Sequence, residues 1–178
     1  AMVKAAAARA NRDLGLLPAH KAEAILAACA DIIGGRLHEA FVVDLIQGGA
    51  GTSTNMNANE VIANLALEKL GQPRGAYAHL HPNDDVNMSQ STNDAYPTAV
   101  CVGLQFAVEP LVEAIASLKR ALEAKGREFA DVIKMGRTQL QDAVPMTLGL
   151  EFEAFAVNLG EDIDRLNEVC ALLCEVNL

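Results

Sequence analysis

The chain has 178 residues, of which 51% are hydrophobic, 21% are charged and only 4% are aromatic. An interior that must be filled by Ala, Leu, Val and Ile favours packed helices over a β-sandwich, and this apolar content excludes a disordered acidic tail. The 23 acidic and 14 basic residues give a net charge of −9. Because the basic residues are scattered, we expect no nucleic-acid partner.

The four cysteines do not suggest a disulfide framework or a zinc site. None belongs to a Cys-x-x-Cys pair, and none has a histidine-rich neighbourhood. They fit small hydrophobic side chains in a reducing compartment. No apolar run reaches the expected membrane-spanning length, and the N-terminus lacks a signal-peptide layout. We therefore expect a soluble cytoplasmic protein with no membrane partner.

In chain order, the first expected helix is the alanine-rich stretch 2–10, which ends within 11–15. Pro18 is placed at the first helical position of a second helix, which carries a helical pattern over Ala19–Ile33. A short helix over about 36–46 is expected next.

A glycine-rich segment, 47–51, then suits a tight turn or close approach to a ligand. Asn57 and Glu60 have the spacing of a helix cap and its return partner. The helix that follows is expected to end at Leu70 and Gly71. Residues 72–87 have the composition of a loop.

Two long helices follow, from about Asp94 to Gly126 and from beyond the loop 135–145 to the last residue, Leu178. Pro110 predicts a kink or local unwinding in the first of them. Apolar residues seven apart form two stripes in each helix, which is typical of a helix bundle. The stripes are Leu104/Leu111/Leu118, Cys101/Val108/Ile115/Leu122, Phe152/Leu159/Leu166/Leu173 and Ala156/Ile163/Cys170.

These patterns predict an all-α protein with a small N-terminal helical domain over 1–90 and the first long helices of a central bundle over 91–178. Each domain is expected to be incomplete at its outer end, so the chain looks cut from a longer one. Three polar segments interrupt the helices, at 49–57, 87–97 and 136–145. Helix N-termini and glycine-rich loops bind anions through free N–H groups, although each segment alone could simply cap a helix or form a turn.

The three segments read GAGTSTNMNANEV from Gly49, HPNDDVNMSQSTNDAYPT from His81 and GRTQLQDAVP from Gly136. They resemble, in the right order, the motifs of the aspartase/fumarase superfamily, and most closely its aspartate-specific members. The resemblance covers nearly the whole chain. It implies an all-helical homotetramer with a shared central bundle. The implied activity is reversible elimination of ammonia from L-aspartate to give fumarate, with no cofactor and no required metal.

The resemblance also assigns roles to six residues. The β-carboxylate and its developing charge would be held by Thr52, Ser91 and Thr92. The amino group would be bound by Asn93, with help from Thr52, and the α-carboxylate or amino end would face Thr138 and Gln139. The general base of the family is a serine on a mobile GSS-type loop, followed by a lysine that binds the α-carboxylate. Neither segment occurs in this sequence, so the 178 residues alone are expected to be inactive.

Two details favour an aspartase over a class II fumarase: Ser-Thr-Asn at 91–93 in place of Ser-Ser-Asn, and Gln139 where fumarases have His. A fumarase or another fumarate-forming lyase remains an alternative, as does a non-catalytic helical scaffold or anion-binding module. His81, Asn83 and Asp84 resemble a secondary dicarboxylate site of fumarases. The sequence His-Pro-Asn-Asp is also typical of a turn, and a turn-forming role is favoured for these residues.

The length of the first long helix predicts that active sites are shared between subunits. The helix over about 94–126 separates Ser91 from Thr138, and the connection after it is too short to run back along its length. We therefore expect Ser91 and Thr138 to serve one site only across a subunit interface.

Overall fold

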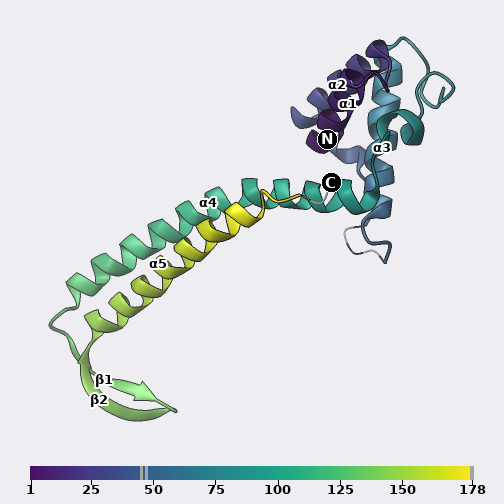
Figure 1. Cartoon of the computed structure of the whole chain (residues 1–178). Coiled ribbons are helices and arrows are strands. Elements are labelled where there is room, and N and C mark those ends of the chain that lie inside the picture. The colour runs from purple at the N-terminus through teal and green to yellow at the C-terminus, as the bar shows by residue number, and fades with distance from the viewer. Residues whose placement is uncertain (45, 47, 177–178) are drawn as a thin grey trace. The chain divides into compact units, whose positions relative to one another are not determined.

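A computed structural model describes residues 1–44, 46 and 48–176 of the chain. It confirms the all-α class, with five α-helices and a single two-stranded sheet in the described part (Figure 1). The residues form two compact units, of which one contains Ala1–Cys101 and the other is Val102–Glu175. The predicted domain boundary at 90/91 stays a prediction.

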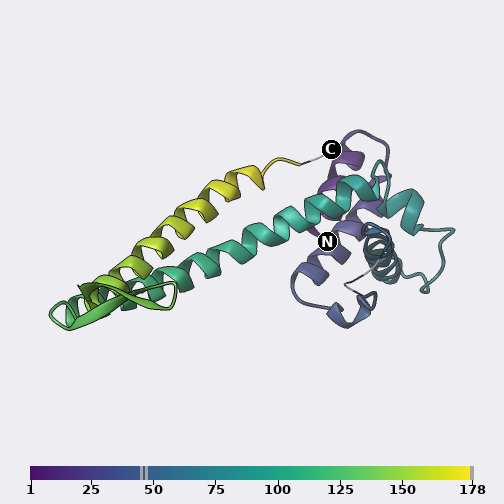
Figure 2. The ribbon, with the colours of Figure 1, turned by 90° about the horizontal axis from the view of Figure 1, so that it is seen from below.

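The first unit is built on three helices: α1 (Met2–Asp13), α2 (Ala19–Ile33) and α3 (Thr52–Lys69). They pack side by side, with α2 contacting both of the others (Figures 1 and 2). Pro18 caps α2 from outside instead of being its first helical residue. The core between the helices is fully buried and consists of small and branched side chains, among them Ala22, Ile25, Ala28, Cys29, Ile62, Ala66, Leu67 and Leu80.

Besides the position of Pro18, two local predictions in this unit are wrong. Among the described residues of the helix expected over 36–46, which leave out Leu45, the helical element is a 3₁₀ turn, His38–Ala40. Leu37 adopts a left-handed φ of 61°, which an α-helix cannot contain. Asn57 is not a cap, since α3 already begins at Thr52 after Gly51. Its amide instead donates to Ala40 O (3.1 Å) and accepts from Val42 N–H (3.0 Å), holding that irregular segment against α3. Gln47, in the predicted glycine-rich turn, lies outside the described residues.

The end of α3 agrees with the prediction, because Leu70 is its C-cap and Gly71 follows with a φ of 72°. The predicted loop 72–87 contains one regular element, a π-helical turn at Pro82–Val86. The ring nitrogen Nδ1 of His81 caps this turn by accepting from the backbone N–H groups of Asn83 and Asp84, each at 3.2 Å.

The long helix α4 (Thr92–Glu128) begins in the first unit and continues through the second. In the second unit α4 is followed by the strands β1 (Ile133–Thr138) and β2 (Gln141–Thr147) and by α5 (Leu148–Leu172). The region expected to be a loop over 135–145 is therefore an antiparallel hairpin with a register shift between Met135 and Arg137. The second long helix ends at Leu172 rather than running to Leu178, which lies outside the described residues.

Helix α4 passes through Pro110 without interruption, so the predicted local unwinding does not occur. Val108, Ile115 and Leu122 are half-buried, as are Leu159 and Leu166 of α5. The stripe Leu104/Leu111/Leu118 is different: these side chains are 47%, 48% and 52% exposed. This apolar face of α4 has no cover among the described residues.

The apolar character of α4 also corrects an expectation about membranes. An 18-residue window of α4 has a mean hydropathy of 1.6, and none of that window is buried. By length and composition alone this helix could cross a membrane. A core helix of a soluble bundle has the same character, because all its faces are covered by other helices.

Candidate functional site

The N-terminal turns of α3 and α4 meet in the first unit. Gly51, the N-cap of α3, lies against the ring of Tyr96 in the first turns of α4. One turn into α3, the Asn55 Nδ2 group donates to Thr92 Oγ1 at 3.0 Å. The structure therefore brings the segment of Thr52 to the segment 91–93, as one shared site requires.

The chain enters α4 through a reciprocal cap. Ser91 Oγ accepts from the backbone N–H of Asn93 (3.2 Å), and the Asp94 carboxylate accepts from the N–H of Ser91 (3.0 Å). Ser91 and Asn93 are exposed and Thr92 is half-buried, so all three side chains stand at an accessible helix end. Free N–H groups and the positive end of the helix dipole make such an end attractive to a carboxylate.

Gly51 leaves no room for a side chain between the two helix starts. Its φ is 87°, and a Cβ atom added there would overlap the Tyr96 ring. We expect Gly51→Ala to lower the free energy of unfolding by about 2–4 kcal/mol, from backbone strain plus overpacking. Gly15→Ala is the matched control, because Gly15 has a similar φ of 73° and nothing within 4 Å of the added Cβ. Denaturant unfolding of both variants measures this difference, and equal losses would contradict the steric explanation.

Thr92 is joined through Asn55 to a network of amides centred on the half-buried Asn87. Its Oδ1 atom accepts from Lys4 Nζ (2.7 Å), Asn55 Nδ2 (3.2 Å) and Asn59 Nδ2 (3.2 Å). Asn87 Nδ2 in turn donates to the backbone carbonyl of Gln90 at 3.0 Å. The network therefore joins α1, α3 and the segment that leads into α4.

Lys4 supplies the positive charge of this network. Its side chain is 4% exposed, and burial lowers the pKa of Lys4 to about 8. The group is thus mainly an ammonium ion at neutral pH, where it favours an anion bound nearby. Burial also raises the pKa of the neighbouring Cys29 thiol to about 11, so this buried cysteine stays protonated and unreactive.

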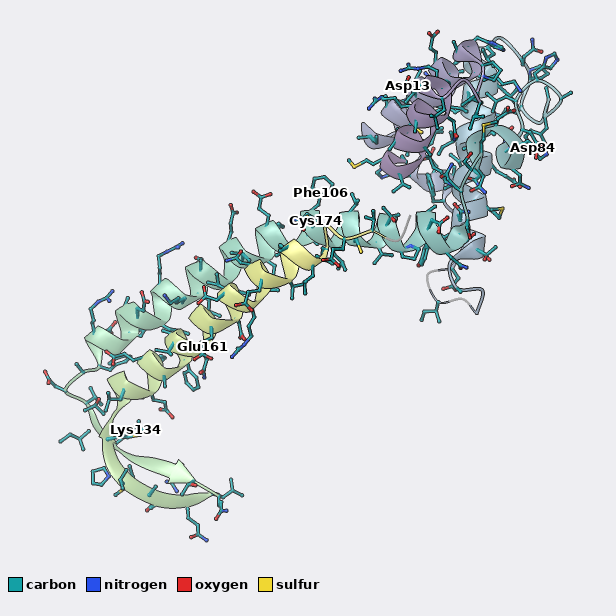
Figure 3. All side chains as sticks on the ribbon, viewed as in Figure 1. Asp13, Asp84, Phe106, Lys134, Glu161 and Cys174 are labelled. Carbon is teal, nitrogen blue, oxygen red and sulfur yellow. The ribbon has the colours of Figure 1, made fainter. Side chains whose placement is uncertain are left out.

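The residues suggested as a secondary anion site, His81, Asn83 and Asp84, lie in the turn Pro82–Val86 and its cap, where His81 stabilises the backbone. His81 Nδ1 is occupied as the cap of Pro82–Val86, and its ring packs edge-on against Tyr77. Asn83 and Asp84 are exposed, and Asp84 projects from the turn (Figure 3). A role of these residues in anion binding stays a prediction.

The buried acid of this turn is Asp85, which the sequence did not single out. Its carboxylate pairs with Lys21 Nζ (2.8 Å) and accepts from the backbone N–H of His81 (2.7 Å). We expect Asp85→Ala to cost about 3 kcal/mol of unfolding free energy, because it leaves a partly buried ammonium and an N–H without partners. The adjacent Asp84→Ala should cost less than about 0.5 kcal/mol, since that carboxylate is exposed. Thermal unfolding of the two variants compares them directly. Equal midpoints would refute the stabilising role given to the Asp85 carboxylate.

Thr138 and Gln139 lie in the second unit, at the tip of the hairpin. Thr138 pairs with Gln141, so Gln139 and Leu140 form a two-residue turn in which both have a left-handed φ, 49° and 61°. This turn normally requires Asn and Gly, and two larger residues there carry backbone strain. Leu140 is 99% exposed, and an ion pair between Arg137 and Asp142 (2.8 Å) braces the strands below. Such strain at an exposed tip is typical of a functional loop.

Of the six residues assigned by resemblance, four are thus gathered at the two helix starts of the first unit, and Thr138 and Gln139 lie on the hairpin. Sequence reasoning missed the supporting network of Lys4, Asn55 and Asn87. One signal was available: Asn55 and Asn59 are four residues apart on α3, and both are buried. Two amides on the buried face of a helix require polar partners.

Comparison with known proteins shows the family of the chain. A family model described as a lyase matches residues 1–177. The aspartate ammonia-lyase of Pseudomonas aeruginosa is 66% identical over all of this chain, which spans 38% of that protein. The aspartate ammonia-lyase of Escherichia coli is 52% identical over 99% of the chain, which spans 37% of it.

Solved structures give the same result. A fumarate lyase:delta crystallin from Brucella melitensis has a TM-score of 0.91 at 67% identity, covering 99% of this chain and 41% of its own. A class II fumarase from Schistosoma mansoni has a TM-score of 0.85 at 36% identity, covering 98% of this chain and 37% of its own. The chain spans little more than a third of the curated relatives cited above. It belongs to the lyase family that contains the aspartate ammonia-lyases.

Proposed function

We propose that the protein containing this chain is an aspartate ammonia-lyase that converts L-aspartate reversibly to fumarate and ammonia. One observation carries the proposal: the helix start 91–93, with two hydroxyls and an amide, adjoins the start of α3. Hydrogen bonds through Asn55 and Asn87 link it to the buried ammonium group of Lys4. This arrangement suits a carboxylate whose negative charge grows during the reaction. The identity to aspartate ammonia-lyases supports the choice of substrate.

The proposed roles follow from the chemistry of the elimination. A base removes a proton from the β-carbon, and the C–H electron pair moves into the β-carboxylate, which becomes a dianion. The electrons then return to form the double bond, and the C–N bond breaks with its pair so that the ammonium group leaves as ammonia. Thr52, Ser91 and Thr92 would donate hydrogen bonds to the dianion, an oxyanion-stabilising task.

The remaining residues would fix the other end of the substrate. Asn93 would bind the amino group, and Thr138 with Gln139 would face the α-carboxylate or the amino end. The base and the α-carboxylate lysine would come from the GSS-type segment of the family, which is not among these 178 residues. The elimination requires no cofactor.

The assembly proposed is a cytoplasmic homotetramer whose sites are shared between subunits. The exposed stripe Leu104/Leu111/Leu118 supports it, because a long apolar helix face is stable in water only when another helix covers it. In a shared bundle α4 would be covered on all sides, which also accounts for its high hydropathy.

The test is an assay of the full-length protein with L-aspartate and, separately, with L-malate, following fumarate by its ultraviolet absorbance. We expect kcat/KM to favour L-aspartate strongly, because Gln139 cannot carry the proton that a histidine would. A preference for L-malate would establish the fumarase alternative. The similarity to a class II fumarase is the observation that favours this alternative. Turnover of neither substrate would support a non-catalytic scaffold.

A further inference from the structure

The chain of hydrogen bonds from Lys4 through Asn87 and Asn55 to Thr92 determines where the hydroxyl proton of Thr92 points. An ammonium group can only donate, so the atom of Asn87 that faces Lys4 at 2.7 Å must be oxygen. The other end of the same amide faces the Gln90 carbonyl at 3.0 Å, which can only accept. The orientation of the Asn87 amide is therefore fixed from both sides.

The fixed orientation of the Asn87 amide in turn fixes the orientation of the Asn55 amide. Asn55 is 4% exposed, and the end of its amide that faces Asn87 Oδ1 at 3.2 Å must be the NH₂ group. The same nitrogen donates its other hydrogen to Thr92 Oγ1 at 3.0 Å. With both hydrogens engaged, the Asn55 amide cannot reverse without placing two oxygens in contact.

Thr92 is the last member of the chain. Its oxygen accepts from Asn55, so its own proton points away from the network, and no described residue accepts it. A free hydroxyl samples several rotamers, whereas one that already accepts a hydrogen bond is restricted to donating outward. An outward donor at the accessible start of α4 is what a carboxylate ligand needs.

We propose that Asn55 is a positioning residue that holds the Thr92 hydroxyl as a hydrogen-bond donor toward the substrate carboxylate. This inference rests on the proposed function and adds a residue to it. Asn55 acts through Thr92 and has no contact with the substrate itself. Its effect should therefore vanish when the Thr92 hydroxyl is absent.

The chain offers a matched control in Asn59. Asn59 is fully buried, lies one turn further along α3 and donates to the same Asn87 Oδ1 at 3.2 Å, but it has no bond to Thr92. Its own Oδ1 has no hydrogen-bond partner among the described residues. A loss of general packing or of the Asn87 network should therefore affect Asn55 and Asn59 variants alike, whereas a positioning role should affect only the former.

The experiment is a double-mutant cycle in the full-length protein with L-aspartate, using Asn55→Leu, Thr92→Val and the double variant, with Asn59→Leu as the control. We expect Asn55→Leu to lower kcat/KM about tenfold, the worth of one well-placed hydrogen bond, and Thr92→Val to lower it further. The double variant should equal Thr92→Val alone. Asn59→Leu should change the melting temperature but keep kcat/KM within about twofold of wild type.

Three results would overturn the proposal: wild-type kinetics for Asn55→Leu, an equal kinetic loss for Asn59→Leu, or losses that multiply in the double variant. If Asn55→Leu does not fold, Asn55→Ala takes its place in the same cycle. The proposed function is tested separately by the wild-type protein. Turnover of L-aspartate by wild type together with a multiplicative cycle would refute the positioning role alone, whereas no turnover by wild type would refute both.

Discussion

The 178-residue chain on its own should be inactive beside the full-length protein, forming fumarate from L-aspartate at least about 10²–10⁴-fold more slowly. The proposed site lacks its base and its α-carboxylate lysine, and loss of a general base alone commonly costs 10²–10⁴-fold in rate. The measurement is ultraviolet detection of fumarate with the purified chain.

The control is the full-length protein at the same concentration and pH. It should turn over at a rate ordinary for enzymes, about 1–10³ per second. Circular dichroism of the short chain separates an inactive folded state from an unfolded one. A short chain that formed fumarate at an ordinary enzymatic rate would show that the base lies within these residues and that the site assignments are wrong.

The helices were predictable wherever an apolar repeat or a clear stop signal defined them. Ala19–Ile33 matches its prediction, and α3 ends at the Leu70–Gly71 signal. The prediction failed where tertiary contacts override local preference. Asn57 has the spacing of a cap, yet it lies inside α3 because the start of that helix is fixed one turn earlier, where Gly51 meets Tyr96.

The hairpin was missed for a different reason. Its turn holds Gln139 and Leu140 instead of the Asn-Gly pair that marks such turns, and β2 contains Pro145. Nothing local in the sequence therefore indicates strands. The turn is formed against its intrinsic preference, which is expected where a loop serves a site.

The candidate site was predictable only in its exposed members. Ser91, Thr92 and Asn93 were identified from a contiguous motif. Lys4 and Asn87 are 83 positions apart, so their hydrogen bond follows from the packing of α1 against the rest of the unit and has no local pattern. The donors that would touch substrate are thus encoded in short segments, whereas the groups that orient them depend on the whole fold.

Subunits carrying Thr92→Ala and Thr138→Ala should restore activity to each other in mixed tetramers of the full-length protein. Thr92→Ala alone should lose about 10²–10³-fold in kcat, because it removes a donor to the developing dianion. Thr138→Ala alone should lower kcat/KM by about tenfold or more, because it removes a contact that holds the other end of the substrate. Helix α4 is 37 residues long, or about 55 Å, and only the nine residues 129–137 separate its end from Thr138. We therefore expect a site to take Thr92 from one subunit and Thr138 from another.

The expected recovery is quantitative. With equal amounts of the two subunits and random assembly, a site that draws the two residues from different chains is intact about one time in four. Co-expression with two affinity tags, followed by purification of mixed tetramers, should thus give roughly a quarter of wild-type activity. Thr92→Ala mixed with Asn93→Ala is the matched control, because both changes fall on the segment that one chain supplies, and it should give no recovery. If the Thr92→Ala and Thr138→Ala mixture stayed as inactive as its parents, both residues would belong to the same chain's site and the shared-site assembly would be wrong.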